Sequence, residues 1–357
     1  MKKKAIIAMS GGVDSSVAAA LSLEHGYDCI GFTLSLFGEK IRSCSFMPEN
    51  GDIDAKETAK KLGIKHHTLN YTEEFNNNVV KHFVETYEQG LTPNPCIECN
   101  RRIKFNMLLL ESHSLDFDLL VTGHYARITQ DTSGRYLLLK AIDEKKDQSY
   151  VLYCLTQHQL KKAFFPLGGM TKSEVRKIAE ARKLGNAAKG ESQDICFIPD
   201  GNYSRFIETY TGKTYPPGDI IDTEGKPIGR HKGLIRYTIG QRRGLGVAAN
   251  TPIYVASKST IDNTVTLAPD SGLYCKSLSA NNINLITCDD IKKPTRVMVK
   301  TRYLQAEQKA TAEQTGENSL HIEFDSPQRA ITPGQAVVMY DGDIVIGGGT
   351  IAMNNEQ

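Results

Sequence analysis

Three cysteines stand in two short segments whose composition favours thiol chemistry. Cys96 and Cys99 form a Cys-x-x-Cys pair that follows two prolines, and Cys196 stands in a second segment that Pro199 ends. Because proline cannot continue a helix, the first segment is predicted to be an extended loop. Basic residues at 101, 102 and 104 and the start of a following helix favour the thiolate form of Cys99. A thiolate attacks sulfur or binds a metal, so both kinds of chemistry are open.

The remaining cysteines are expected to be structural. The chain has 357 residues and eight cysteines, and its first apolar run is too short for a secretory signal. A disulfide framework is therefore not expected. A zinc site would need a second ligand pair at zinc-finger spacing, which the sequence lacks. We expect five buried structural thiols: Cys29, Cys44, Cys154, Cys275 and Cys288.

A glycine- and serine-rich loop is the second chemical feature. Residues 10–16, Ser-Gly-Gly-Val-Asp-Ser-Ser, lie between a predicted strand at 5–9 and a predicted helix at 15–25. Glycines let the backbone approach a phosphate, and the free N–H groups of a helix start bind it. Asp14 would repel a phosphate unless it holds Mg2+ or orients another group. A plain turn with Ser15 as helix cap is the alternative, but the whole heptapeptide at this junction favours a nucleotide site.

Strand-like and helix-like patterns alternate through the first part of the chain. This alternation predicts an α/β fold with a Rossmann-like, doubly wound parallel sheet. A hairpin is expected at 125–129 and 135–141, around a Ser-Gly turn. Strands are predicted at 5–9, 28–37, 65–70 and 118–122, and helices at 15–25, 54–62, 73–89, 105–113, 156–163 and 171–183.

The pattern changes near residue 202, where the helical signal almost stops. Short strands separated by turns follow, most clearly at 297–303, 321–324, 335–340 and 344–347. Such spacing predicts a small antiparallel barrel or sandwich. No run approaches the roughly 20 apolar residues that a membrane span needs, so we expect a cytoplasmic protein without a membrane partner.

Basic residues cluster in two places that fit a nucleic-acid surface. The net charge is only +2, so such a surface must be a local patch. Residues 230–243 contain five Lys or Arg and no acid, and Tyr237 offers a face for stacking. Residues 293–309 are also basic and include Arg302 and Tyr303. A solvated basic face is the alternative for the first segment.

These motifs together resemble a known family. The loop at 10–15 is similar to the SGGxDS signature of the PP-loop ATP pyrophosphatases, which cleave ATP between its α and β phosphates. Over nearly its whole length, the chain is similar to the bacterial tRNA-specific 2-thiouridylases, which place sulfur on the wobble uridine of tRNA. The resemblance rests on residues 10–15, 94–99, 122–125, 146–148, 192–199, 233–246 and 334–335.

The resemblance implies an ATP-binding catalytic domain at 1–201, a central tRNA-binding linker domain at 202–270 and a C-terminal β-barrel at 271–357. Cys99 would be the first catalytic thiol, and Cys196 would carry a persulfide. A cysteine desulfurase or a persulfide carrier protein would supply the sulfur. ATP would contact Ala8, Met9, Ser10, Gly11, Gly12, Val13, Asp14, Ser15, Leu34 and Gly123, and tRNA would contact Asn94, Pro95, Cys96, His124, Lys146, Asp147, Gln148, Arg302, Tyr303 and Gln335.

Cys96 departs from the commoner family pattern, in which an Asp stands at this position and is proposed to act as acid or base. A thiol could also move protons, although its pKa differs. The change provides a third cysteine, and three thiolates would suit a 4Fe–4S cluster with one open iron. Alternatively, Cys96 only fills space. Two rival functions are another PP-loop ligase or amidotransferase, and a non-catalytic, nucleotide-sensing RNA-binding protein.

Overall fold

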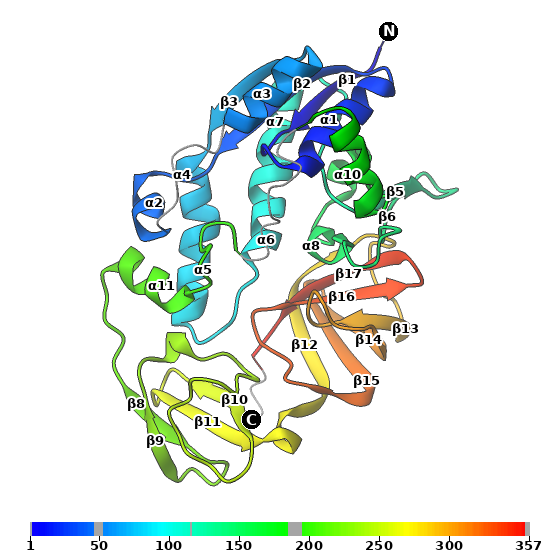
Figure 1. Ribbon diagram of the computed structural model, residues 1–357. Helices are drawn as coiled ribbons and strands as arrows, with labels where there is room; N and C mark the ends of the chain where they lie inside the picture. The colour runs from blue at the N-terminus through cyan, green and yellow to red at the C-terminus, as the bar shows by residue number, and fades with distance from the viewer. Residues whose placement is uncertain (1, 46–52, 115, 185–194, 354–357) are drawn as a thin grey trace.

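A parallel sheet forms the first part of the molecule. The computed structural model describes residues 2–45, 53–114, 116–184 and 195–353. Within these residues, the sheet has the strand order β3-β2-β1-β4-β7, and each neighbouring pair runs parallel (Figure 1). Its strands are β1 (Lys4–Ala8), β2 (Asp28–Ser35), β3 (Lys65–Asn70), β4 (Leu119–Val121) and β7 (Ala163–Phe164).

Helices cover both faces of this sheet, because alternate residues of β1 belong to different cores. Ile7 packs with residues of α1 (Val13–Glu24), α3 (Ile53–Leu62) and α10 (Lys172–Ala181). Ile6 packs instead with Phe105 and Leu108 of α7 (Phe105–Ser114). An aliphatic strand that is buried on both sides is typical of a parallel sheet between two helix layers. The predicted doubly wound sheet is confirmed.

The cysteine segment is helical, so the predicted extended loop is wrong. Pro95 begins α6 (Pro95–Glu98), which runs on through a π-helix, η2 (Cys99–Lys104), into α7. Proline is tolerated in the first turn because the N–H it lacks would have no helical partner there. Asn94 caps this helix, since its side-chain oxygen accepts a hydrogen bond from the Cys96 N–H at 3.2 Å.

Other helical segments differ from the prediction mainly at their ends. The helix expected at 73–89 contains a π-helical turn, and α1 begins at Val13 rather than at residue 15. Helix α11 lies just after residue 202, where the sequence pattern indicated that helices almost stop. The remaining bounds are α2 (Glu39–Ser45), α4 (Thr72–Phe75), η1 (Asn76–Val80), α5 (Lys81–Glu88), α8 (Ser149–Leu152), α9 (Gln157–Lys162), α11 (Tyr203–Thr211), η3 (Leu234–Arg236) and η4 (Asp270–Leu273).

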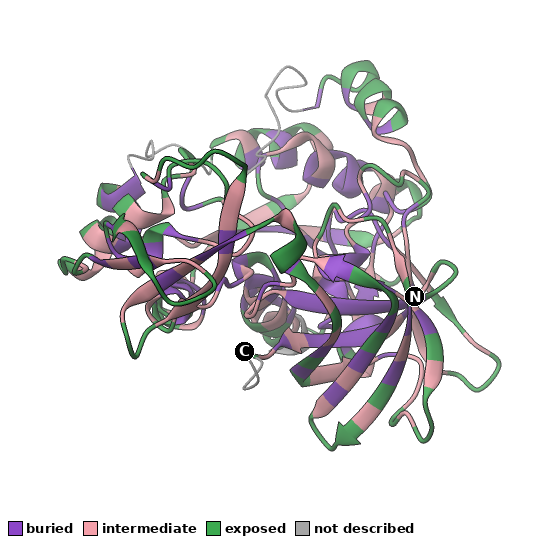
Figure 2. Ribbon diagram, turned by 90° about the horizontal axis from the view of Figure 1, so that it is seen from below, coloured by how far each residue is buried: buried purple, intermediate pink, exposed green. Residues whose placement is uncertain are grey.

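Two further sheets make up the rest of the described chain. The smaller has the order β10-β11-β8-β9 and lies below α11 in Figure 1. The larger is antiparallel and closes into a barrel through pairing of β12 with β17. Buried and exposed residues alternate along its strands (Figure 2), so one face of each strand fills the barrel interior. The strands are β8 (Gly218–Ile221), β9 (Pro227–His231), β10 (Ile253–Ser259), β11 (Thr264–Pro269), β12 (Tyr274–Leu285), β13 (Thr295–Lys300), β14 (Gln308–Gly316), β15 (Ser319–Arg329), β16 (Ala336–Asp341) and β17 (Ile344–Ile351). The predicted barrel is confirmed.

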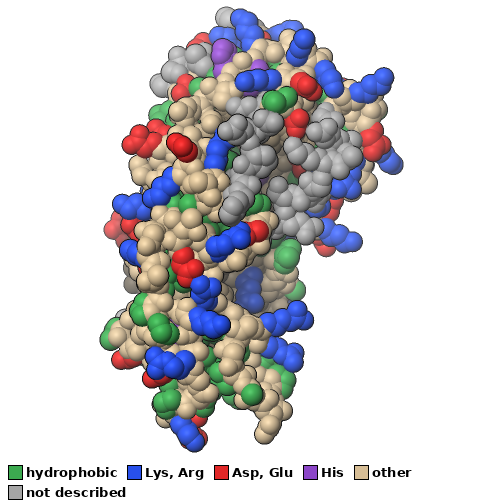
Figure 3. All heavy atoms as spheres, turned by 60° about the vertical axis from the view of Figure 1, so that its left-hand side comes forward, with side chains coloured by type: hydrophobic (Ala, Val, Ile, Leu, Met, Phe, Trp, Pro, Cys, Tyr) green, Lys and Arg blue, Asp and Glu red, His purple; other side chains and the backbone are tan. Residues whose placement is uncertain are grey.

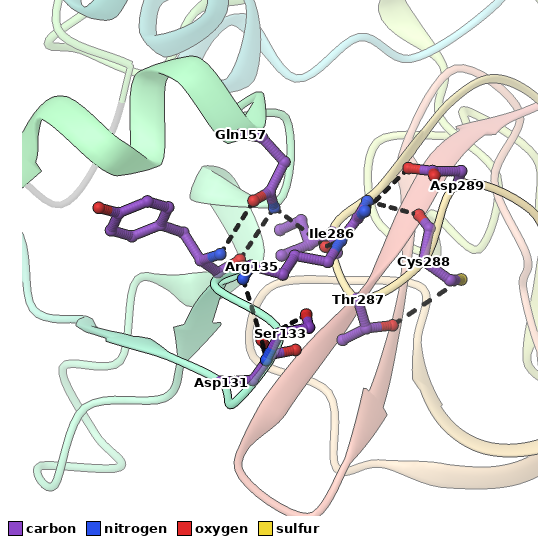
Figure 4. A network of polar contacts seen from close by, with 9 residues as sticks. Asp131, Ser133, Arg135, Gln157, Ile286, Thr287, Cys288 and Asp289 are labelled. Carbon is purple, nitrogen blue, oxygen red and sulfur yellow. Dashed lines mark hydrogen bonds and ion pairs between the residues drawn. The ribbon is translucent and has the colours of Figure 1, made fainter.

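The barrel is joined to the first part of the molecule by the hairpin β5 (Arg127–Gln130) and β6 (Tyr136–Leu139). Strand β6 pairs with β17, and Arg135 reaches the barrel connection after β12 (Figure 4). The Arg135 guanidinium donates to the carbonyls of Ile286 at 2.6 Å and Cys288 at 2.8 Å. It also pairs with Asp289 at 2.8 Å. These bonds fix the barrel relative to the parallel sheet. None of the helices in the described residues is both long and apolar enough to cross a membrane.

Candidate active site

The loop after β1 has the geometry of an anion cradle. Gly11 has a φ of 75°, which lets the chain turn sharply into α1. Gly12 is the N-cap residue of α1 and makes no side-chain cap, so no capping side chain occupies the first N–H groups of the helix, which are the groups that bind an anion. The Ser15 hydroxyl receives a hydrogen bond from the Ser10 N–H at 3.2 Å and donates to the Gly12 carbonyl at 3.0 Å. These bonds hold the loop closed on itself.

Asp14 is held by two groups that the sequence analysis did not single out. Its carboxylate accepts hydrogen bonds from the Lys172 ammonium at 2.6 and 2.8 Å and from the Tyr125 hydroxyl at 2.8 Å. Lys172 is the first residue of α10, and Thr171 caps that helix in a capping box. Because Asp14 orients Lys172, a cation stands beside the phosphate cradle. The sequence left open whether Asp14 holds a metal or orients another group, and this arrangement fits the second role.

Two other residues expected to contact ATP lie at the same edge of the sheet. Leu34 is near the carboxyl end of β2, and Gly123 follows β4, while the loop follows β1. Gly123 touches the loop closely, because a Cβ there would lie 2.8 Å from the Asp14 carbonyl carbon and 2.9 Å from the Ser15 nitrogen. Ligands of doubly wound folds bind at this edge. The geometry therefore brings these residues together, although ATP itself remains an expectation.

The three candidate cysteines meet at one place. Cys96 and Cys99 lie near each other on α6 and η2, and both are close enough to Cys196 to affect its ionisation. Cys196 is placed by its neighbour Phe197, whose carbonyl accepts a hydrogen bond from the buried Ser45 hydroxyl at 2.5 Å. The Phe197 ring packs in an aromatic cluster with Phe75, Phe83 and Phe206. Residues 192–194 of the predicted motif lie outside the described residues.

Burial opposes the thiolate form that the sequence predicts for Cys99. Burial raises the pKa of Cys99 to about 11, and Lys104 only partly opposes this shift. The surrounding protein and the other two thiols raise the pKa of Cys196 to about 12, although this residue is exposed. Arg101 and Arg102 both pair with Glu98, at 3.0 and 2.8 Å, and the cation that favours the thiolate of Cys99 is Lys104.

Thiol alkylation should reveal these raised pKa values. Cys99 reacts as thiolate, so its alkylation rate should rise about tenfold per pH unit from pH 7 to 10. N-acetylcysteine should level off earlier under the same conditions. Lys104→Met removes the charge that favours the thiolate and should slow Cys99 further at pH 8. Mass spectrometry of Cys99 peptides gives the rates. A Cys99 rate that reaches its plateau by pH 8.5 would contradict this assignment.

Residues from the barrel reach the cysteine site. Burial, with smaller contributions from Asp147 and Cys96, raises the pKa of Tyr303 to about 12, so its ring lies near both. Gln335 donates hydrogen bonds to the carbonyls of Thr92 and Pro93, just before α6. The structure therefore brings part of the expected tRNA-binding set to the thiols.

Several members of that set are occupied by internal contacts. The buried Asp147 carboxylate accepts from the Ser149 hydroxyl at 2.8 Å and from the Ala141 N–H at 3.0 Å. The Gln148 side chain accepts from the Tyr125 N–H at 2.9 Å. Arg302 donates to the Ala330 carbonyl. These contacts hold the loop around residue 147 and the end of β13 in place.

His124 is buried and neutral. Its Nδ1 lies 2.7 Å from the Thr122 hydroxyl, and its ring packs against Phe105 and Phe165. Burial and the nearby Lys104 hold its pKa well below the usual value. The charge of Lys104 also lowers the pKa values of Cys99 and Cys196, so Lys104 lies between this strand end and the thiols. Gly123, the residue before His124, touches the loop at Asp14, so this strand end adjoins the cradle.

The basic segment at 230–243 exposes all five of its Lys and Arg residues but not its tyrosine. Tyr237 is only 4% exposed, so its predicted role as a stacking face is wrong. It packs in the core of the small sheet with Val255 and Val265. Arg236 pairs with Glu208 at 2.5 Å, and Arg242 and Arg243 are exposed at the other end of the segment. Figure 3 shows basic side chains spread over the lower part of one face, alongside scattered acidic ones.

The five cysteines that were expected to be structural are not all buried. Cys29, Cys44 and Cys154 are buried as expected, but Cys275 and Cys288 are only half-buried.

The cysteine site is not arranged as a metal site in this structure. Within the described residues, no group of three or more His, Cys, Asp or Glu is arranged to hold a metal ion. The three thiols at 96, 99 and 196 have the right chemistry for an iron–sulfur cluster but would have to move closer to ligate one.

A parallel sheet with this cradle at the end of β1 indicates an enzyme of the PP-loop class. Residues 3–200 match the family model described as tRNA methyl transferase HUP domain, residues 204–269 its PRC-barrel domain, and residues 275–351 the aminomethyltransferase beta-barrel domain. The tRNA-specific 2-thiouridylase MnmA of Acetivibrio thermocellus is 45% identical over 98% of this chain and 99% of its own. The enzyme of that name from Heliobacterium modesticaldum is 47% identical over 99% of this chain and 94% of its own. The chain belongs to the family of bacterial tRNA-specific 2-thiouridylases.

Proposed function

We propose that this chain uses ATP to replace the C2 oxygen of the wobble uridine in tRNA with sulfur. The observation that carries the proposal is the proximity of Cys96, Cys99 and Cys196 in a chain that also has the phosphate cradle. A ligase or amidotransferase of the same class would leave these thiols without a role. The proposal also includes Mg2+ with ATP, a cytoplasmic location, and the domain boundaries 1–201, 202–270 and 271–357.

The first half-reaction activates the base. The C2 oxygen of uridine attacks the α phosphorus of ATP, the bond to the β phosphate breaks, and pyrophosphate leaves. The cradle and Lys172 hold the phosphates, and Asp14 keeps Lys172 oriented through the bonds at 2.6 and 2.8 Å. The charge of Lys172 stabilises the negative charge that moves onto the leaving pyrophosphate. Mg2+ would add positive charge at the same phosphates.

The second half-reaction transfers sulfur. A cysteine desulfurase or persulfide carrier loads a sulfur atom onto Cys196. The terminal persulfide sulfur attacks C2, and AMP leaves with the former C2 oxygen. Cys99 then attacks the Cys196 sulfur, so the old S–S bond breaks, the thiocarbonyl remains on the base, and a Cys99–Cys196 disulfide forms. A thiol reductant restores both cysteines. In the other order, Cys99 attacks first and releases sulfide, which attacks C2.

Substitutions at Cys96 separate this persulfide route from a three-cysteine 4Fe–4S cluster. In the persulfide route, Cys96→Asp keeps activity, and Cys96→Ala loses at most an acid/base contribution of about 10²–10⁴-fold. In the cluster route, iron and activity fall together in the order Cys, Asp, Ala, because thiolate binds iron more firmly than carboxylate. Iron, sulfide and thiolation are measured without oxygen. An active, iron-free Cys96→Ala enzyme excludes the cluster, whereas joint loss of iron and activity excludes the persulfide route.

The exposed arginines of the basic segment should contribute to tRNA affinity. Replacing Arg242 and Arg243 with Ala should weaken binding and reduce the log–log salt slope by roughly 0.7–0.9 per lost phosphate contact. ATP affinity should not change. Arg236→Ala is the matched control, since Glu208 already neutralises that side chain. Filter binding at several salt concentrations gives the slopes. Equal slopes for the Arg242/Arg243 variant and the unmodified protein would mean that these arginines form a solvated face and do not bind tRNA.

A further inference from the structure

The turn between β15 and β16 of the barrel grips the chain just before the cysteine helix. The Thr92 N–H donates to the Pro333 carbonyl at 2.9 Å. The Gln335 amide nitrogen donates to the carbonyl of Thr92 at 3.0 Å and to that of Pro93 at 3.2 Å. We call residues Pro333, Gly334 and Gln335 the barrel clamp. It joins two segments that are more than 240 residues apart in the sequence.

The clamp is closely fitted and firmly held. Gly334 has a φ of 89°, and a Cβ at this residue would lie 2.9 Å from the Thr92 nitrogen and 3.0 Å from the Leu91 Cβ. Only glycine fits such an approach without a shift of backbone. The Gly334 N–H donates to the Ile351 carbonyl at 2.9 Å, and the Ile351 N–H donates to the Gln335 carbonyl at 2.8 Å. Strand β17 therefore holds the clamp in place.

The gripped residues lead directly into the site. Thr92 and Pro93 precede Asn94, which caps α6, and α6 carries Cys96. A movement of the Thr92 or Pro93 carbonyl would move this cap and the start of the helix. We propose that Gln335 and Gly334 are positioning residues, which set the place of the cysteine helix from the barrel.

The orientation of the Gln335 amide follows from its two acceptors. Both hydrogens of Nε2 point to carbonyl oxygens, and the reversed amide would place Oε1 against them, which is repulsive. Oε1 is then directed away from Thr92 and Pro93, and it is the part of this amide that can accept a hydrogen bond from tRNA. One side chain thus offers Oε1 to tRNA and holds the start of the cysteine helix through Nε2, so tRNA binding on the barrel shifts the position of the thiols.

This positioning role rests on the proposed function in tRNA thiolation. Its test, however, uses the full chain without tRNA or ATP. Gln335→Glu keeps the shape and an acceptor, but places a carboxylate against the two carbonyls. Hydrogen exchange of the Thr92 amide should become about tenfold faster or more, because its bond to Pro333 opens more often. Alkylation of the buried Cys99 should accelerate several-fold. With tRNA present, kcat for thiolation should fall more than KM for tRNA rises.

Two glycines provide a matched pair. Gly334→Ala places a Cβ against Thr92 at a φ of 89°, whereas Gly225→Ala, in the β8–β9 turn, imposes a similar backbone strain at a φ of 82° with no neighbour within 4 Å. Only the first should speed Thr92 exchange and Cys99 alkylation. If both glycine variants exchange the Thr92 amide and alkylate Cys99 at the same rates, the proposal is overturned. It is also overturned if the Gln335→Glu protein loses tRNA affinity while its Thr92 exchange and Cys99 alkylation rates without tRNA stay unchanged. If the Gly334→Ala protein does not fold, the exchange and alkylation rates of the Gln335→Glu protein test the proposal alone. Because exchange and alkylation need no catalysis, a failure of thiolation would not be mistaken for a failure of the clamp.

Discussion

Replacing Cys196 with serine should reduce tRNA thiolation to background, a loss of about a thousandfold or more, because a hydroxyl cannot carry the persulfide sulfur. Pyrophosphate should still form, since base activation depends on the cradle and Lys172. The measurement is thiouridine in digested tRNA by mass spectrometry, beside pyrophosphate release. Cys275→Ser is the matched control, because this half-buried thiol belongs to the barrel strand β12. Full thiolation by the Cys196→Ser enzyme would remove Cys196 from the mechanism.

The partner substitution, Cys99→Ser, gives a complementary result. Thiolation should fall as far, but Cys196 should now retain its persulfide after incubation with a sulfur-donating protein, since the thiol that attacks it is absent. A persulfide-specific label followed by peptide mapping detects this species. Labelling of Cys99 instead of Cys196 would reverse the roles that we assign to the two cysteines.

Asp14→Asn should lower base adenylation by about a hundredfold or more, because the neutral amide no longer holds the Lys172 ammonium at the cradle. tRNA affinity should stay close to that of the unmodified protein. Lys172→Met should give a similar loss, and the double variant should lose little more, since the two residues act as a unit. Tyr125→Phe removes one hydrogen bond to Asp14 and should cost only several-fold, or about 1 kcal/mol.

Lys177→Met is the control for this series, because Lys177 is an exposed lysine on the same helix, α10. Pyrophosphate release in a single turnover with tRNA present reports adenylation, and tRNA binding is measured separately. A normal rate of pyrophosphate release by Asp14→Asn would refute the assignment of Asp14 to the cradle.

The sequence was sufficient to predict the parallel sheet and the cradle, because both depend on local patterns. Alternating strand and helix signals specify the doubly wound fold, and the glycines at 11 and 12 follow β1 directly. Lys172 could not be found in this way. It lies 158 residues from Asp14, and only the fold brings α10 to the loop. Its sole local signal is its place after the helix cap Thr171.

The sequence pattern predicts that Pro95 prevents a helix, but this proline occupies the first helical turn after the cap Asn94. In a helix, Glu98 meets residues three and four positions later, so it pairs with Arg101 and Arg102. Burial of Cys99 depends on distant segments, so the raised pKa was not readable from the sequence.

The central claim is that one chain couples ATP cleavage to sulfur transfer onto tRNA. The purified full-length protein, prepared without oxygen, is incubated with unmodified tRNA, ATP, Mg2+ and either sulfide or a persulfide-loaded donor protein. Thiouridine at the wobble position is then quantified by mass spectrometry with AMP and pyrophosphate. Our account predicts that all three products form in equal amounts, and that omission of ATP or of the sulfur source abolishes thiouridine. Formation of AMP and pyrophosphate without any thiouridine, or of a methylated base in its place, would contradict it.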